Sequence, residues 1–195
     1  MRIIVEYYRI WIKGKPKFAG VTMNPFRQIA QQKIIKGAIQ KYNSYGNEWE
    51  KAYFDEFSGG YVVCHKDHQF DPTIGKFGIP RGDYEKNASK VLSKYGKRIV
   101  LESEISEEGI KTPDGLLNEV KFDIKGIEGS SYRIIKEAIS KSSKQGAEIV
   151  VFYFHDKNMF NTNFVRESYE KYLINSKSKR VKKVYCVVGK YLYRI

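Results

Sequence analysis

Two aspartates and a lysine near the middle of the chain have the spacing of a site that binds a cation and a phosphate. Asp123 and Lys125 are two residues apart on an expected strand, so both side chains point to the same face. A hairpin turned at Asn118-Glu119 brings Asp114, on the preceding strand, alongside Asp123. Two carboxylates at one position repel each other and favour a divalent cation between them. Asp114 and Asp123 are therefore the expected metal ligands.

This combination of residue types suits the cleavage of a phosphodiester bond. A cation such as Mg²⁺, held by Asp114 and Asp123, polarises a phosphate oxygen and lowers the pKa of a bound water. Lys125 orients that water or offsets the charge of the transition state. RNA also carries its own nucleophile, the 2′-hydroxyl, and cleavage by that route needs no activated water. The sequence leaves the metal-dependent and the metal-independent routes open.

Helices and strands alternate around these residues, which indicates an α/β fold of the mixed-sheet (α+β) kind. Turn residues and hydrophobic periodicity predict strands at 61–64, 98–101, 114–118, 120–125, 148–154, 181–188 and 191–193, and helices at 83–95, 132–144 and 164–173. The order helix, three strands, helix, strand, with Pro113-Asp114 and Asp123-x-Lys125, resembles the αβββαβ core of the PD-(D/E)xK nuclease superfamily. In that superfamily a glutamate of the first helix often joins the site, and the matching residue here is Glu85.

Three segments resemble a more closely defined family. The stretches EKNASKVLSKYG, TPDGLLNEVKFDIKG and IIKEAISKSSKQGAEIVVFYF look like the C-terminal tRNase domain of bacterial contact-dependent growth inhibition toxins of the CdiA type. Asp114, Asp123, Lys125 and Gln145 match that pattern by position. The resemblance implies a toxin-type endoribonuclease that cleaves tRNA in the cytoplasm, with an acidic immunity protein as partner. It leaves open whether the chain is delivered from another cell within a larger toxin or is an intracellular relative.

Other side chains are candidates for acid–base chemistry or for binding a nucleic acid. His65 and His68 follow the 61–64 strand and suit proton transfer, although a polar strand end is the structural alternative. Gln145 contacts a base or a phosphate, or caps its helix. Expected phosphate contacts are Arg133 at a helix start and three cations of the lysine-rich segment before the last strands, Lys179, Arg180 and Lys182.

The composition narrows the class of partner. The chain has 195 residues, with 35 Lys and Arg against 22 Asp and Glu, a net charge of +13. A folded protein this basic attracts polyanions, of which nucleic acid is the commonest. No apolar run approaches the roughly 20 residues of a membrane helix. Cys64 and Cys186 cannot form a disulfide scaffold or a four-ligand zinc site. We therefore expect a cytosolic protein with a nucleic-acid partner, no membrane span and no small-molecule ligand.

The chain divides near Ser58-Gly59-Gly60. Residues 1–57 are predicted to form a small β-α-α extension, with a strand within 3–12, a helix that Asn24 caps and a second helix over 48–57. Residues 58–195 form the nuclease-like domain. The expected function is cleavage of RNA, with tRNA as the expected substrate. The alternatives are a DNA endonuclease on the same fold and a nucleic-acid-binding protein that keeps the scaffold without catalysis.

Overall fold

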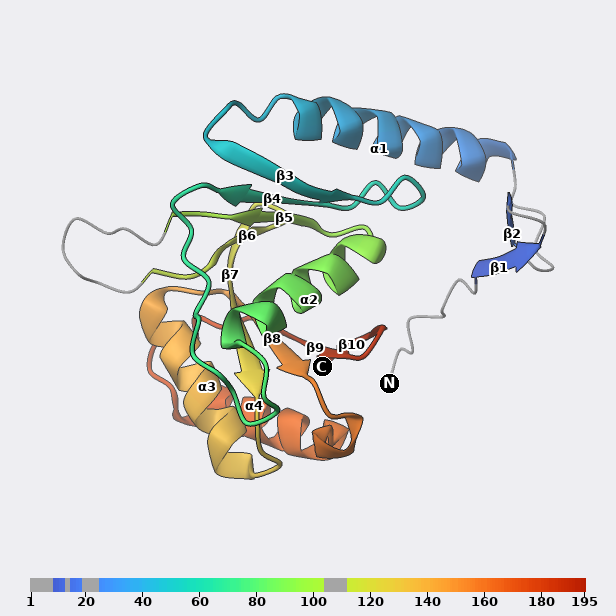
Figure 1. Ribbon diagram of the computed structural model, residues 1–195. Helices are drawn as coiled ribbons and strands as arrows, with labels where there is room; N and C mark the ends of the chain where they lie inside the picture. Colours follow the sequence, from blue (N-terminus) through green and yellow to red (C-terminus); the bar gives the residue numbers. More distant parts are fainter. Residues whose placement is uncertain (1–8, 13–14, 19–24, 104–111) are drawn as a thin grey trace.

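The computed structural model describes residues 9–12, 15–18, 25–103 and 112–195 (Figure 1). The strands of the large sheet are β3 (Trp49–Phe54), β4 (Tyr61–His65), β5 (Arg98–Leu101), β6 (Gly115–Leu117), β7 (Val120–Ile127), β8 (Ile149–Phe154), β9 (Lys183–Val188) and β10 (Tyr191–Arg194). The other elements are the paired strands β1 (Arg9–Ile12) and β2 (Lys15–Phe18), the helices α1 (Pro25–Asn43), α2 (Arg81–Lys94), α3 (Tyr132–Gln145) and α4 (Thr162–Asn175), and the short 3₁₀ helix η1 (Lys157–Met159).

The large sheet is mixed, which confirms the predicted α/β class. Within the described residues its eight strands follow the order β10-β9-β8-β7-β6-β5-β4-β3. The pairs β4–β5, β7–β8 and β8–β9 are parallel, and the other pairs are antiparallel. The predicted order of helix, three strands, helix and strand is present as α2, β5, β6, β7, α3 and β8. None of the helices in the described ranges is long and apolar enough to cross a membrane.

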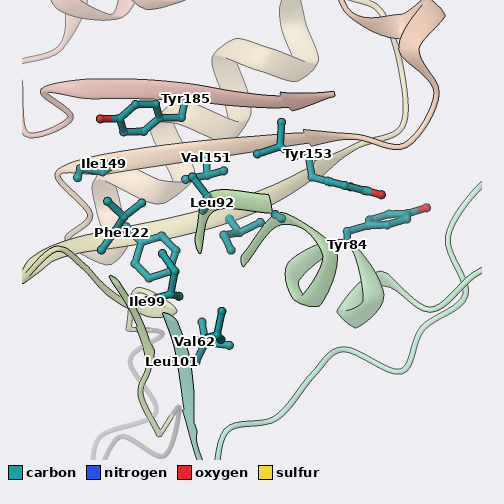
Figure 2. Packing of buried hydrophobic residues seen from close by; sticks show 14 of the residues in the cluster. Val62, Tyr84, Leu92, Ile99, Leu101, Phe122, Ile149, Val151, Tyr153 and Tyr185 are labelled. Atoms are coloured by element: carbon teal, nitrogen blue, oxygen red, sulfur yellow. The ribbon is translucent and has the colours of Figure 1, made fainter. Parts of the chain in front are cut away.

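Side chains of β8 alternate between two cores, which places this strand inside the molecule. Ile149, Val151 and Tyr153 pack with α2 on one face of the sheet, as Figure 2 shows. The intervening residues of β8 pack against α3 and α4 on the other face. All residues of β8 are buried, as the continuous β-branched and aromatic run predicts. The third cluster, under α1, contains Ala38, Tyr61 and Val63.

The segment from 48 to 57 is the clearest error of the sequence prediction. It was expected to be helical, but residues 49–54 form β3, which pairs with β4. A register shift between Glu50 and Tyr53 interrupts the strand. Trp49 therefore packs in the cluster under α1 and Tyr53 against the cluster that contains α2, so the apolar residues do not alternate as in a regular strand. Residues 3–8 of the expected first strand, and the expected helix cap Asn24, lie outside the described residues. The division near residue 58 stays a prediction, and β3 and β4 are hydrogen bonded across it.

The hairpin of β6 and β7 has the register that the spacing of the aspartates predicts. Asn118 and Glu119 both have positive φ angles, 49° and 68°, as the tight two-residue turns of hairpins require. Gly115 pairs with Phe122, so continuing the register by one residue sets Asp114 opposite Asp123. β6 does not extend past this point, whereas β7 continues to Ile127 and, among the described strands, pairs there with β8 alone. The sheet is therefore open along one edge of β7.

A glycine on the open part of β7 lets α2 approach the sheet. A Cβ atom on Gly126 would lie 2.1 Å from Cδ2 of Tyr84, in the first turns of α2. The Tyr84 ring in turn stacks on Tyr153 of β8, with 5.6 Å between the ring centroids. Because no side chain separates Gly126 from this ring, the beginning of α2 lies against the edge of β7.

We expect Gly126→Ala to destabilise the protein by about 1–3 kcal/mol, because the added methyl group must displace a buried aromatic ring. The matched control is Gly37→Ala in α1, where an added Cβ meets no atom within 4 Å. That substitution should leave stability unchanged or raise it by about 0.5–1 kcal/mol, since alanine is the better helix former. Urea unfolding measures both variants. Equal stability of the Gly126→Ala variant and the natural chain would show that this close approach does not exist.

Candidate active site

The carboxylate of Asp123 is fully buried. Its side chain has no solvent-exposed surface, and its Oδ2 atom lies 2.8 Å from Nζ of Lys125. The same oxygen accepts a hydrogen bond from the hydroxyl of Ser142, on α3. The other oxygen, Oδ1, is buried and accepts no hydrogen bond from any residue that the structure describes. One carboxylate oxygen is thus held from two sides while the other is left without a donor.

Asp114 lies beside Asp123, one residue before β6 begins. Its Oδ2 atom accepts a hydrogen bond of 2.5 Å from the backbone N–H of Ile124, a donor on the open edge of β7. Burial raises the pKa of Asp114 well above its usual range, and the negative charges of Asp123 and Glu85 raise it further. The ammonium of Lys125 and the hydrogen bond from Ile124 act in the opposite direction but do not outweigh these causes. The structure therefore brings the two predicted aspartates into one electrostatic unit.

Lys125 stays charged at this site. Burial lowers the pKa of its ammonium, but the charges of Asp123 and Asp114 outweigh burial and raise the pKa above its ordinary value. Its Nζ atom also lies 3.2 Å from Oε1 of Gln145, at the end of α3. The amide nitrogen of Gln145 donates in turn to the carbonyl of Thr112, at 3.4 Å. The structure thus joins Gln145, predicted by position, to Lys125.

A cleft of about 760 Å³ opens beside this group, between the beginning of α2 and the end of α3, and the buried Asp123 is not among the residues that line it. Asp114, Lys125 and Gln145 line it, and so does Glu85, whose side chain is 13% exposed. Glu85 reaches the cleft from α2, across the sheet from the α3 residues that contact Asp123. Three cations also line the cleft: Lys141, Lys144 and Arg81, which pairs at 2.8 Å with Glu128, another residue of the lining. An acidic centre with cations at its rim suits a phosphate chain, because the rim attracts the phosphates and the centre is suited to a bound cation.

The two candidate histidines lie in different surroundings. His68 is buried, and its Nε2 atom lies 2.8 Å from Oε1 of Glu85. His65 instead packs edge-on against Trp49, with 5.0 Å between the ring centroids, and its Nδ1 atom accepts from the backbone N–H of Asp67. The structure therefore connects His68 with the cleft and leaves His65 outside the cleft lining.

The predicted phosphate-binding cations are not gathered in one place. Arg133 begins α3, whereas the cleft is lined by the other end of that helix, about 18 Å away at the helical rise. Its side chain is 85% exposed and pairs with Glu137. Lys182 pairs with Glu148 at 2.6 Å, and Lys179 is exposed. Arg180 lies near the end of α3. Its Nη1 atom would be 3.5 Å from a Cβ atom placed on Gly146, the residue after Gln145. Arg133 therefore lies away from the cleft and its phosphate contact stays a prediction, while Arg180 adjoins the end of α3.

Sequence reasoning missed Ser142, which contacts Asp123. The signal was present, because Ser142 occupies the buried face of α3 together with Ile135 and Ile139. A serine among apolar helix positions needs a hydrogen-bond partner when it is buried. Its oxygen also lies 3.0 Å from the carbonyl oxygen of Ala138, but the carboxylate of Asp123 could be identified as a partner only from the strand register.

The donor set fits a divalent cation that keeps part of its water shell. In the described part of the chain, no group of three or more His, Cys, Asp and Glu side chains is placed to hold a metal ion. Mg²⁺, however, is commonly bound by one or two carboxylates together with water and substrate phosphate. The free Oδ1 atom of Asp123 and the unneutralised charge at Asp114 are suited to that arrangement. These two residues would hold the ion.

Comparison with known proteins assigns no family to the chain. No family model, no curated protein and no solved structure matches it.

Because the pKa of Asp114 is raised, the free energy of unfolding should depend on pH. Above the unfolded pKa of about 3.9, the unfolded chain loses its proton from this group before the folded chain does, so ionisation costs stability as the pH rises. Asp114→Asn keeps an acceptor for the N–H of Ile124 and removes the charge. We therefore expect the variant to be more stable than the natural chain at pH 7 and to lose this advantage near pH 3.

Urea unfolding between pH 3 and 8, with a chelator present, measures this difference. Asp67→Asn, at a side chain that is 59% exposed, is the control and should change stability little at any pH. A less stable Asp114→Asn variant at pH 7 would mean that the carboxylate is well compensated, against the account of the site given above.

Proposed function

We propose that this chain is an endoribonuclease of the toxin type, which cleaves RNA phosphodiester bonds in the cleft between α2 and α3. The observation that carries the proposal is the meeting of Asp114, Asp123 and Lys125 at the open edge of β7. Buried like charges destabilise the folded protein. Groups of this kind concentrate at catalytic sites, where function requires them. The arrangement supports an αβββαβ nuclease core of the PD-(D/E)xK kind.

A bound cation would neutralise negative charge, and residues of the chain would position the groups that contact the phosphate. Asp114 and Asp123 would hold a divalent cation, which would polarise the scissile phosphate and lower the pKa of a water. Lys125 extends from the buried Asp123 into the cleft, and its side chain is 26% exposed. Its ammonium is therefore available to a phosphate oxygen as negative charge develops there in the transition state. Gln145, hydrogen bonded to that ammonium, fixes its direction.

The choice of RNA, and of tRNA among RNAs, comes from sequence similarity. Residues from about 60 to 155 resemble the tRNase domains of contact-dependent growth inhibition toxins, and the net charge of +13 suits a polyanionic substrate. The cations Arg81, Lys141 and Lys144 at the rim of the cleft supply contacts to phosphates. An acidic immunity protein that covers this basic rim is the partner that a toxin of this type requires.

A cleavage assay with and without magnesium tests the proposal. Incubation with total RNA and with duplex DNA should give RNA fragments, enriched in tRNA, when Mg²⁺ is present. RNA cleavage that persists in EDTA assigns the route to the 2′-hydroxyl and removes the cation from the mechanism. Cleavage of DNA alone makes the chain a DNA endonuclease. Binding without cleavage of either polymer makes it a nucleic-acid-binding protein on the same scaffold.

Lys125→Ala should reduce RNA cleavage by about 100-fold or more, because the variant loses a charge that stabilises the transition state. Affinity for RNA, measured by gel shift, should change little, since the rim cations remain. Lys121→Ala is the matched control, because this exposed lysine lies on the same strand and the same face. Equal cleavage by the Lys125→Ala variant and the natural chain would remove Lys125 from the site.

A further inference from the structure

We propose that His68 is a positioning residue, present as an imidazolium, that holds the carboxylate of Glu85 in the cleft and ties it to the strand that carries Asp114. The ring lies in the loop between β4 and α2, and its side chain has no solvent-exposed surface. Its effect on catalysis rests on the proposed nuclease activity. Its state of protonation does not, and is measured on the resting protein.

Both contacts of the His68 ring are made to acceptors. Its Nδ1 atom lies 2.7 Å from the carbonyl oxygen of Glu102, and its Nε2 atom lies 2.8 Å from Oε1 of Glu85. A carbonyl oxygen has no proton to give, so Nδ1 donates. The second contact then needs one proton, either on Nε2 of the ring or on the carboxyl group of Glu85.

That proton belongs on the ring. The ordinary pKa of a histidine, about 6.5, lies above that of a glutamate, about 4.3, so the imidazole holds the shared proton more tightly. The charge of Asp114 opposes this preference, because each of the two acids favours the neutral form of the other, but the raised pKa of Asp114 reduces the charge that it carries. Lys86, over the ring of Phe70, opposes the preference, but it is exposed and screened by solvent. His68 therefore pairs with Glu85 as a cation.

The same ring connects Glu85 with the strands of the site. The carbonyl of Glu102 accepts from His68, and the backbone N–H of Glu102 donates to the carbonyl of Asp114, at 3.0 Å. A single residue at the end of β5 is thus hydrogen bonded both to His68 and to Asp114. Glu85 belongs to α2 and Asp114 precedes β6, so this chain of contacts fixes a helix carboxylate relative to a strand carboxylate.

Direct acid–base catalysis by His68 does not fit these contacts. Both ring nitrogens are engaged, the side chain has no exposed surface, and the ring of Phe70 packs edge-on against it with 4.8 Å between the centroids. A substrate in the cleft meets Glu85, whose side chain lines it, and does not meet the histidine. The histidine acts through the glutamate.

Nitrogen NMR of the histidine rings tests the protonation state without any assay of activity. At pH 7 the His68 ring of the natural chain should show protons on both nitrogens. In the Glu85→Gln variant the amide of residue 85 can donate to Nε2, so the ring should become neutral with its proton on Nδ1. A neutral His68 ring in the natural chain at pH 7 would overturn the proposal.

A double-mutant cycle on RNA cleavage tests the positioning role. His68→Ala should lower kcat by about 10–100-fold with a smaller effect on KM, as for residues that orient a group of the active site. In the Glu85→Gln background the same substitution should cause no further loss, because the group that it positions is already gone. Equal losses in both backgrounds would overturn the positioning role.

Two further variants keep the outcome decisive. His68→Gln retains an N–H for Glu85 and should recover part of the activity, so it also serves if His68→Ala does not fold. His155→Ala removes an exposed histidine and should cleave as the natural chain does. If the natural chain cuts no nucleic acid, the nuclease proposal fails, and the NMR result alone decides whether His68 holds Glu85 as a cation.

Discussion

The candidate site depends on the difference in length between two neighbouring strands. β6 begins only at Gly115, whereas the antiparallel β7 continues past this point to Ile127 and there pairs, among the described strands, with β8 alone. The unpaired edge leaves backbone N–H groups that need acceptors. The carboxylate of Asp114 accepts from one of these groups, the N–H of Ile124. The same opening lets α2 and α3, on opposite faces of the sheet, both reach the cleft. Without it, Asp123 and Glu85 would be separated by a continuous sheet.

Negative charge is concentrated at this opening in a protein whose net charge is positive. Asp114, Asp123 and Glu85 surround a single cleft-lining lysine of β7, Lys125, among the described residues. Burial strengthens the repulsion between these carboxylates. Hydrogen bonds from Ser142 to Asp123 and from the N–H of Ile124 to Asp114 offset part of it. The proposed His68 cation adds one more compensating charge. A site that retains excess negative charge inside a basic surface is suited to a cation that arrives with a phosphate chain.

Local spacing predicted the parts of the site that lie close together in the chain. A two-residue turn fixes which residues of the two flanking strands face each other, so the meeting of Asp114 with Asp123 followed from counting. The contacts of Ser142 and His68 required the packing of helices onto the sheet, which no local pattern encodes. The position of Arg133 relative to the cleft also depends on that packing, because the cleft is lined by the other end of α3. The strand at 49–54 was missed because its bulge breaks the alternation that is typical of a strand.

The most direct test of the central claim is a crystal structure of the protein soaked in Mn²⁺, with the anomalous signal of the metal recorded. The account predicts one ion in the cleft, within about 2.0–2.6 Å of an oxygen of Asp114 and of Oδ1 of Asp123, with Lys125 still beside Oδ2. A cleft without an ion at saturating Mn²⁺, and with the two aspartates turned toward separate partners, would contradict it.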